Sequence, residues 1–405
     1  MAATLSVGHL DLILKCAEVC NLNCSYCYYY NMGDDSWKRR PKKIGSDTLG
    51  ALHKWLSDGI RDLRIDTVTV TLHGGEPLLL QPKELEDICA GIRATVAEAG
   101  ATCRLSVQTN GVLIDAQWLD VFSRQDISVG VSIDGPPAVQ DRYRVDKQGR
   151  GSSRAVENGV ALLHSQPGIR SGSLSVIDPS LSGSEAYAYL RRLGFSWMDF
   201  LIPMDCYSDA PSPERVHAVG KFLADVAAAW FDDPKQDDVV VRIIDHYLRS
   251  FQQYAERVVP NRHPKLSGHA PIVVVSVHSD GTLGFREEVF NSGFGKNDAI
   301  QAIGTTSLLS FVNSSPFRQL EVAYSTVPED CSSCEYLGVC GGGDPKNRFD
   351  PTTGTFANRS VYCEGLKLLF GYLIDRLVAD GYPAHRIEAK LLSNASFLRE
   401  VAKLS

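Results

Sequence analysis

Short hydrophobic runs typical of strands alternate with stretches of helical periodicity through the first two thirds of the chain. The strand-like runs are LDLILK (10–15), TVTVTLHGG (67–75), CRLSVQTNG (103–111), SVGVSIDG (128–135), SGSLSVID (171–178) and WMDFLIP (197–203). Six strand-then-helix units predict a parallel sheet, because each parallel connection needs a crossover. Since a closed barrel of this kind has eight units, we expect an α/β fold with an open, partial (β/α)6 barrel.

The alternation ends near residue 205, and the rest of the chain has a different organisation. Helical periodicity follows over 212–257, and APIVVVSVHSDGTLGFREEV predicts two strands joined by a Ser-Asp-Gly turn. A segment rich in cysteine and glycine comes next, before a final helical stretch. We therefore predict a barrel domain over 1–205, a helical linking region over 206–257 and a smaller domain over 258–405.

Composition narrows the possible locations and partners. The chain has 405 residues, 44% of them hydrophobic and 22% charged, as expected for a soluble globular protein. Its formal net charge of −7 argues against a nucleic-acid surface, which needs basic side chains to neutralise phosphates. No apolar run approaches the length of a membrane span, and the N-terminus lacks the basic region and cleavage site of a secretory signal. We expect a cytoplasmic protein without a membrane partner.

The eleven cysteines fall into two clusters and four scattered positions. A disulfide framework would need an oxidising compartment, to which the sequence offers no route. The scattered residues are predicted to be buried as small hydrophobic side chains: Cys16, Cys89, Cys103 and Cys206. The clustered residues are the candidate metal ligands: Cys20, Cys24 and Cys27 at the front, and Cys331, Cys334, Cys340 and Cys363 at the rear.

The front cysteines are separated by three residues and then by two. A structural zinc site has four ligands, whereas this set has three cysteines and no nearby histidine. A [4Fe–4S] cluster held by three thiolates keeps one iron free for a small chelating molecule, which can then receive an electron. The spacing therefore favours a cluster with an open iron.

These motifs, taken in order, give a resemblance to a known family. The spacing of the front cysteines, HGGEPLL after the next strand, QTNG (108–111) and SIDGP (132–136) resemble the radical S-adenosylmethionine (SAM) enzymes, and the rear cysteines resemble their SPASM-type branch. The resemblance implies a partial barrel, a site [4Fe–4S] cluster and reductive cleavage of SAM to methionine and a 5′-deoxyadenosyl radical. It also implies an electron donor such as flavodoxin or ferredoxin.

The resemblance extends to residues that contact the cofactor. It implies that Gly74, Gly75, Glu76 and Pro77 bind the amino group of the methionine moiety, and that Tyr26 lies against the adenine. Four polar residues at strand ends are expected either to contact cofactor or substrate or to cap local turns: Gln108, Asn110, Ser132 and Asp134. Arg154 is the candidate for clamping the cofactor carboxylate.

The rear cysteines supply a complete set of four thiolates. Such a set can hold one auxiliary [4Fe–4S] cluster without an open iron, which suits electron transfer, and the triple glycine after Cys340 suits a backbone that bends around it. A structural zinc site remains an alternative, because Cys-x2-Cys pairs commonly bind zinc. These four are the only cysteines that follow Cys206 in the sequence, so the sequence provides for one auxiliary cluster.

The function predicted from this resemblance is peptide modification. CYYYNMGDDSWKRRP and VCGGGDPKNRFDPTTGTFANRSVYCEGL most resemble maturases that join an arene to a side-chain β-carbon of a ribosomally made precursor peptide, forming a cyclophane. Asp205, at the end of the sixth strand, is the candidate catalytic base. The alternatives are a sulfatase-type maturase that oxidises serine or cysteine to formylglycine and, in another class, a non-catalytic iron–sulfur electron carrier or zinc-binding protein.

Overall fold

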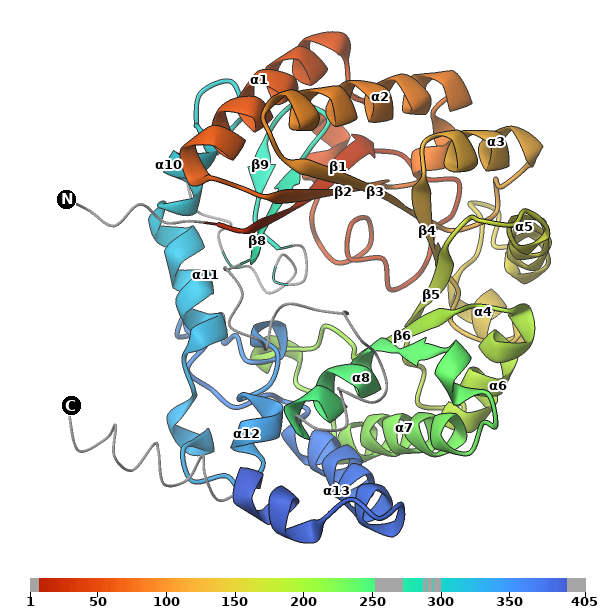
Figure 1. Cartoon of the computed structure of the whole chain (residues 1–405), viewed down its shortest axis with the longest axis vertical. Coiled ribbons are helices and arrows are strands. Elements are labelled where there is room, and N and C mark those ends of the chain that lie inside the picture. Colours follow the sequence, from red (N-terminus) through yellow and green to blue (C-terminus); the bar gives the residue numbers. More distant parts are fainter. Residues whose placement is uncertain (1–6, 252–271, 287–288, 290–293, 295–299, 392–405) are drawn as a thin grey trace.

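The computed structural model describes residues 7–251, 272–286, 289, 294 and 300–391. A curved sheet forms its centre, and helices cover the convex side of that sheet (Figure 1). None of the helices in the described residues is long and apolar enough to cross a membrane.

Six parallel strands form the barrel wall in the order of the sequence. They are β1 (His9–Ala17), β2 (Thr67–Gly74), β3 (Thr102–Thr109), β4 (Ile127–Ser132), β5 (Ser171–Val176) and β6 (Trp197–Leu201). Their bounds agree with the predicted runs to within a few residues. The prediction of an α/β partial barrel is confirmed.

The sheet is wider than the six predicted strands. On the side of β6 it continues into β7 (Val240–Val241), and on the side of β1 into β8 (Ile272–Val277) and β9 (Leu283–Gly284). The predicted hairpin is present, because β8 and β9 pair in antiparallel fashion. Its first strand also pairs in parallel with β1, so the hairpin extends the barrel sheet.

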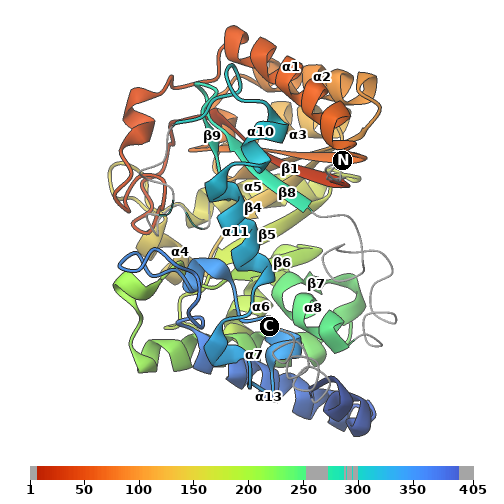
Figure 2. The ribbon, with the colours of Figure 1, turned by 90° about the vertical axis from the view of Figure 1, so that its left-hand side faces the viewer.

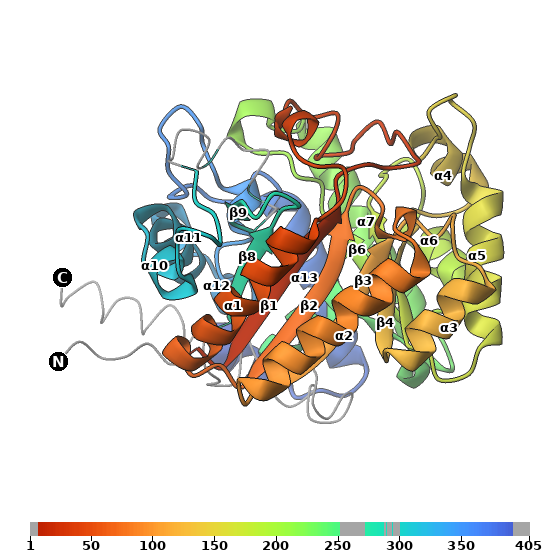
Figure 3. The same ribbon diagram turned by 90° about the horizontal axis from the view of Figure 1, so that it is seen from above.

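Helices connect the strands and cover the outer face, as seen from the side and from above (Figures 2 and 3). Those associated with the barrel are α1 (Ser46–Leu63), α2 (Pro82–Glu98), α3 (Ala116–Arg124), α4 (Pro137–Tyr143), α5 (Ser153–Ser165) and α6 (Gly183–Leu193). Those that follow are α7 (Pro213–Phe231), α8 (Arg242–Leu248), α10 (Leu308–Val312), α11 (Ser315–Ser325), α12 (Leu337–Cys340) and α13 (Cys363–Ala379).

Alternation along the strands separates an apolar outer face from a polar inner face. In β2, Val68, Val70 and Leu72 are buried in the main hydrophobic core beneath the helices. The intervening Thr71 and His73 lie on the opposite face, because successive side chains of a strand point to opposite sides. The concave face of the barrel therefore presents polar groups toward its carboxyl end, where enzymes of this architecture assemble their sites.

Two glycines let α13 pack directly on α7. A Cβ atom added to Gly220 of α7 would lie 2.3 Å from the carbonyl oxygen of Gly365, and one added to Gly365 would lie 2.5 Å from the carbonyl oxygen of Val216. These contacts are with backbone, which cannot move aside as a side chain can. Since α13 begins at Cys363, the close helix crossing also fixes the position of that cysteine.

We predict that Gly220→Ala lowers the free energy of unfolding by about 1–3 kcal/mol, because the added methyl group overpacks the α7–α13 contact. Gly371→Ala is the matched control, since Gly371 lies in α13 with nothing within 4 Å of an added Cβ atom. That change should stabilise the helix by up to about 1 kcal/mol. Urea denaturation measures both, and equal effects of the two substitutions would contradict the helix contact described here.

Candidate active site

The three front cysteines belong to the loop that follows β1. Figure 3 shows this loop at the carboxyl end of the barrel strands. All three are partly buried. The backbone N–H of Leu22 and the side-chain amide of Asn110 donate hydrogen bonds to Sγ of Cys20, at 3.4 Å and 3.8 Å. Hydrogen bonds to sulfur are among the features that tune iron–sulfur clusters, so the loop fits a set of thiolate ligands.

Burial disfavours ionisation of these thiols in the absence of a metal. It raises the pKa of Cys20 to about 12, and the nearby Glu76 carboxylate adds to that effect. Burial also raises the pKa of Cys24, although the Arg144 guanidinium opposes it. Because coordination deprotonates a thiol outright, these residues suit metal ligation better than the role of free nucleophiles.

A buried carboxylate, Asp134, fastens this loop to the barrel. Its side chain is 1% exposed and accepts two hydrogen bonds from Arg144, at 2.8 Å from Nε and 3.0 Å from Nη2. It also accepts a hydrogen bond from the hydroxyl of Tyr26, in the cysteine loop, and one from the backbone N–H of Val176 at 2.9 Å. Asp134 thus joins the cysteine loop, the end of β5 and the segment after α4.

Arg144 is a site residue that the sequence analysis missed. Its guanidinium carbon lies 5.4 Å from the centre of the Tyr26 ring, within the range of a cation–π interaction. Backbone hydrogen bonds reinforce the contact, from Asn23 to the carbonyl of Val145 at 2.7 Å and from Ser25 to that of Tyr143 at 3.1 Å. The sequence around Arg144, RYRVD (142–146), contains no motif with a distinctive spacing. Only the fold therefore reveals that Arg144 contacts the cysteine loop.

Arg154, the predicted clamp for the cofactor carboxylate, is exposed in the first turn of α5. The buried guanidinium beside the cysteine loop belongs instead to Arg144. Cofactor binding by Arg154 stays a prediction.

The GGEP segment packs against the start of the cysteine loop. The N–H groups of Gly75 and Glu76 donate to the carbonyl oxygens of Ala17 and Val19, at 2.8 Å and 2.9 Å. A Cβ atom on Gly74 would lie 1.9 Å from the Ala17 oxygen, and one on Gly75 would lie 2.2 Å from the Val19 oxygen. These glycines thus permit close approach of the chain to itself, and the predicted contact of Gly74, Gly75, Glu76 and Pro77 with the cofactor stays a prediction.

Glu76 braces the neighbouring strand end. Its carboxylate is completely buried and accepts hydrogen bonds from the backbone N–H of Leu78 at 3.0 Å, the hydroxyl of Thr109 at 2.7 Å and the backbone N–H of Asn110 at 2.7 Å. Burial raises its pKa to about 7, against the effect of these donors. Pro77 begins the short turn that follows. The GGEP segment therefore connects the cysteine loop to the QTNG segment at the end of β3.

Polar groups on the inner faces of β1 to β4 contact one another. The amide of Gln108 donates to the hydroxyl of Ser132 at 2.8 Å. The ammonium of Lys15, which is fully buried, donates to the hydroxyl of Tyr28 at 3.0 Å and lies 3.3 Å from Nδ1 of His73. The predicted residues Gln108 and Ser132 are thus close together, whereas Lys15 and His73 were not singled out from the sequence.

A second set of contacts joins the cysteine loop to the hairpin turn. Glu18 is buried and accepts hydrogen bonds from the hydroxyl of Tyr29 and the backbone N–H of Ser279, the latter at 3.1 Å. The ring of Tyr29 stacks on that of His278 with centroids 6.3 Å apart. These contacts hold the hairpin turn to the loop that follows β1.

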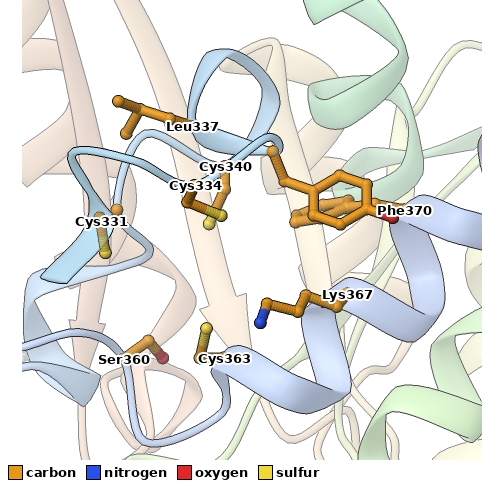
Figure 4. A pocket seen from close by; sticks show the side chains of 10 residues that line it. Cys331, Cys334, Leu337, Cys340, Ser360, Cys363, Lys367 and Phe370 are labelled. Atoms are coloured by element: carbon orange, nitrogen blue, oxygen red, sulfur yellow. The ribbon is translucent and has the colours of Figure 1, made fainter. Parts of the chain in front are cut away.

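The four rear cysteines line one cavity (Figure 4). Their side chains come from the segment around α12 and from the first residue of α13. Burial raises the pKa of Cys340 to about 12, with a smaller contribution from the negative charge of a neighbouring Cys363 thiolate. Four neighbouring thiolates would repel one another, and the iron ions of a bound cluster would offset that repulsion. The cavity therefore suits an iron–sulfur cluster.

The triple glycine shapes one wall of this cavity. Gly341, Gly342 and Gly343 have φ angles of 63°, 89° and 81°, which favour glycine. The predicted bend after Cys340 is therefore present. Among the described residues, no three side chains of His, Cys, Asp and Glu are arranged to hold a single metal ion.

Asp205 connects the end of β6 to the rear cysteines. Its carboxylate accepts a hydrogen bond from the hydroxyl of Tyr362, next to Cys363, and lies 3.5 Å from Nε of Arg215. The side-chain amide of Asn347 donates to the carbonyl oxygens of Asp205 and Pro203, at 2.8 Å and 2.9 Å. Asp205 thus contacts Tyr362 on the segment that carries the rear cysteines. Its role as a catalytic base stays a prediction.

Comparison with known families identifies the class. Residues 14–192 match the family model of the radical SAM superfamily, and this part of the chain is a radical SAM domain. Such a domain implies a [4Fe–4S] cluster and SAM, and the loop of Cys20, Cys24 and Cys27 lies within the matched residues. The chain is an enzyme, as its sequence predicted, so the electron-carrier and zinc-protein alternatives for the whole chain are not supported.

Particular relatives extend over most of the chain. The serine-type anaerobic sulfatase-maturating enzyme of Bacteroides thetaiotaomicron is 27% identical over 89% of this chain and 88% of its own length. The cysteine-type enzyme of Clostridium novyi is 23% identical over 91% and 96%. A solved structure described as native anSMEcpe with bound AdoMet has the same fold, with a TM-score of 0.76, 21% identity and coverage of 92% and 98%.

These relatives overturn the predicted reaction. The cyclophane prediction is wrong, because the curated relatives that match along nearly the whole chain are named as sulfatase-maturating enzymes. The resemblance relates the short motifs used for that prediction to cofactor and cluster binding, and motifs of that kind do not specify the bond that the enzyme forms or breaks.

We predict that Gly75→Ala lowers the amount of iron bound by the front cysteines, because the methyl group would displace the backbone at Val19, next to Cys20. Iron and sulfide analysis after anaerobic reconstitution measures this. Gly50→Ala is the control, since nothing lies within 4 Å of a Cβ atom at that position in α1. If Gly75→Ala binds as much iron as the control, the GGEP segment does not position the cysteine loop.

Proposed function

We propose that this enzyme oxidises a seryl or cysteinyl residue of a peptide or protein substrate to formylglycine. The observation that carries the proposal is the similarity to both serine-type and cysteine-type sulfatase-maturating enzymes along about nine tenths of the chain. The fold also supports the proposal. Solved structures with this fold include complexes described as containing AdoMet and a peptide.

The reaction removes two hydrogens from a serine side chain, turning –CH2OH into –CHO. When bound, SAM with the front cluster supplies the radical that takes a hydrogen atom from the β-carbon, and an auxiliary cluster at the rear supplies an acceptor for the remaining electron. A base takes the remaining proton. A cysteine side chain loses the same hydrogens to give a thioaldehyde, which water converts to the aldehyde with release of hydrogen sulfide.

The protein groups have separate tasks in this proposal. Cys20, Cys24 and Cys27 hold the front cluster, and the four rear cysteines hold one auxiliary [4Fe–4S] cluster. Asp134 keeps the cysteine loop in place by accepting hydrogen bonds from Tyr26 and Arg144. An external one-electron donor, such as flavodoxin or ferredoxin, reduces the front cluster.

The remaining predicted residues belong to cofactor binding and proton transfer. The inner-face groups of the barrel, Gln108 and Ser132 among them, are proposed to contact cofactor or substrate. Asp205 stays the proposed base. To act as one, its carboxylate would have to exchange the hydrogen bond from Tyr362 for one from the substrate.

The reconstituted, reduced enzyme should convert a serine- or cysteine-containing sulfatase peptide into a product that reacts with an aldehyde probe. The serine product should be lighter by two hydrogens. Deuterium at the β-carbon should appear in 5′-deoxyadenosine, because the hydrogen atom is taken from that carbon. Mass spectrometry follows both.

The matched controls are a peptide with alanine at the target position and the enzyme variant Cys24→Ala. The first should give no aldehyde, and the second should give no 5′-deoxyadenosine. A product that resists the aldehyde probe while the β-deuterium is transferred would overturn formylglycine formation and leave the radical chemistry intact.

A further inference from the structure

Two cationic side chains lie close to the cavity of the rear cysteines. Lys367, on the first turns of α13, lines the cavity together with the four cysteines, and Figure 4 shows its ammonium beside the sulfur of Cys363. Arg348 lies behind Gly342, which also lines the cavity, since a Cβ atom on Gly342 would be 3.7 Å from its Nη1.

Arg348 is a buried cation whose hydrogen bonds go to uncharged groups. It is 2% exposed. Nε donates to the carbonyl oxygens of Phe356 and Asn358, Nη1 to that of Ala323, and Nη2 to those of Thr326 and Phe356, at 2.8–3.2 Å. These carbonyl oxygens satisfy its donors without neutralising its charge. A buried charge without a counter-ion is costly, so the arrangement calls for an anion nearby.

The rear cysteines would provide that anion once they hold a cluster. Four thiolates make a bound [4Fe–4S] cluster negative, and one-electron reduction makes it more negative. A fixed cation beside the cavity stabilises the reduced form more than the oxidised form, so it raises the reduction potential. In ionised form, the thiols of Cys331 and Cys340 would interact favourably with Arg348, as the Asp344 carboxylate does. Those of Cys334 and Cys363 would interact in the same way with Lys367.

The two cations differ in how strongly their charge acts. Arg348 is shielded from solvent and forms no salt bridge within the described part of the chain, although the Asp344 carboxylate also acts on its charge. The side chain of Lys367 is 38% exposed, and its Nζ lies 3.2 Å from the Glu364 carboxylate. Glu364 also pairs with Arg359 at 3.3 Å. Glu364, next to Cys363, therefore opposes the effect of Lys367.

We propose that Arg348 and Lys367 raise the reduction potential of an auxiliary cluster held by the rear cysteines, so that it accepts the electron released from the substrate, and that Glu364 limits this effect. The inference rests on the proposed function, because only an electron-accepting cluster needs such a potential. Both cations are positioning residues that act through the cluster rather than on the substrate.

The experiment is a redox titration of the reconstituted enzyme followed by electron paramagnetic resonance. Lys367→Met should lower the potential of the rear cluster by about 59 mV, which is a tenfold change in the equilibrium constant of a one-electron couple. Glu364→Gln should raise it. Lys367→Arg keeps the charge and should leave the potential near that of the unchanged enzyme.

Two controls separate a local effect from a change in net charge. Lys54→Met removes the same charge from the exposed surface of α1 and should shift neither cluster. The signal of the front cluster should stay constant in every variant. Arg348→Gln should shift the rear cluster in the same direction as Lys367→Met and by more; if that variant does not fold, Lys367→Met and Glu364→Gln decide the question by their opposite signs.

Each outcome bears on a different part of the account. Iron for only one cluster would overturn both the auxiliary cluster and this inference. Two clusters with an unchanged rear potential in Lys367→Met and Glu364→Gln would overturn the inference alone. Formylglycine formation, assayed separately with the unchanged enzyme, reports on the proposed function independently of either result.

Discussion

The carboxylate of Asp134 is the interaction on which the front of the site depends. It is almost completely buried and lies at the point where β4 ends, and it accepts hydrogen bonds from the cysteine loop, from the segment after α4 and from β5. Arg144 neutralises it with two hydrogen bonds. Breaking a buried pair of this kind costs about 3–5 kcal/mol, because the remaining charge stays buried without a partner. The cysteine loop is thereby held in one position against a rigid sheet.

The rear of the site is attached to the same barrel by different means. Asp205 and Asn347 join the end of β6 to the segment that carries the rear cysteines, through Tyr362 and two backbone carbonyls. The glycines of α7 and α13 bring the helix that begins at Cys363 into close contact with the barrel helices. Both sets of cysteines thus take their positions from one sheet, which suits a reaction that uses both.

The sequence predicted the strands and the cysteine sets because each depends on local patterns. Alternating residues define the strands, and cysteine spacing defines the two sets of candidate ligands. The contacts of Arg144 and Glu18 could not be predicted, because each joins segments far apart in the chain and neither has a distinctive spacing. Arg348 donates to backbone carbonyls, which no pattern of side chains marks in the sequence. The glycines of GGEP were recognised as sites of close approach, but the approaching group, the backbone of Val19, follows only from the fold. The reaction itself was mispredicted because motifs shared for cofactor binding do not specify the substrate.

Amide hydrogen exchange over residues 20–31 tests most directly the claim that Asp134 fixes the cysteine loop. Asp134→Asn replaces one acceptor oxygen by an amino group that faces the guanidinium of Arg144. The account predicts faster exchange over these residues in this variant than in the unchanged protein, while the strands β1 to β3 keep their protection. Unchanged exchange over residues 20–31 would contradict it.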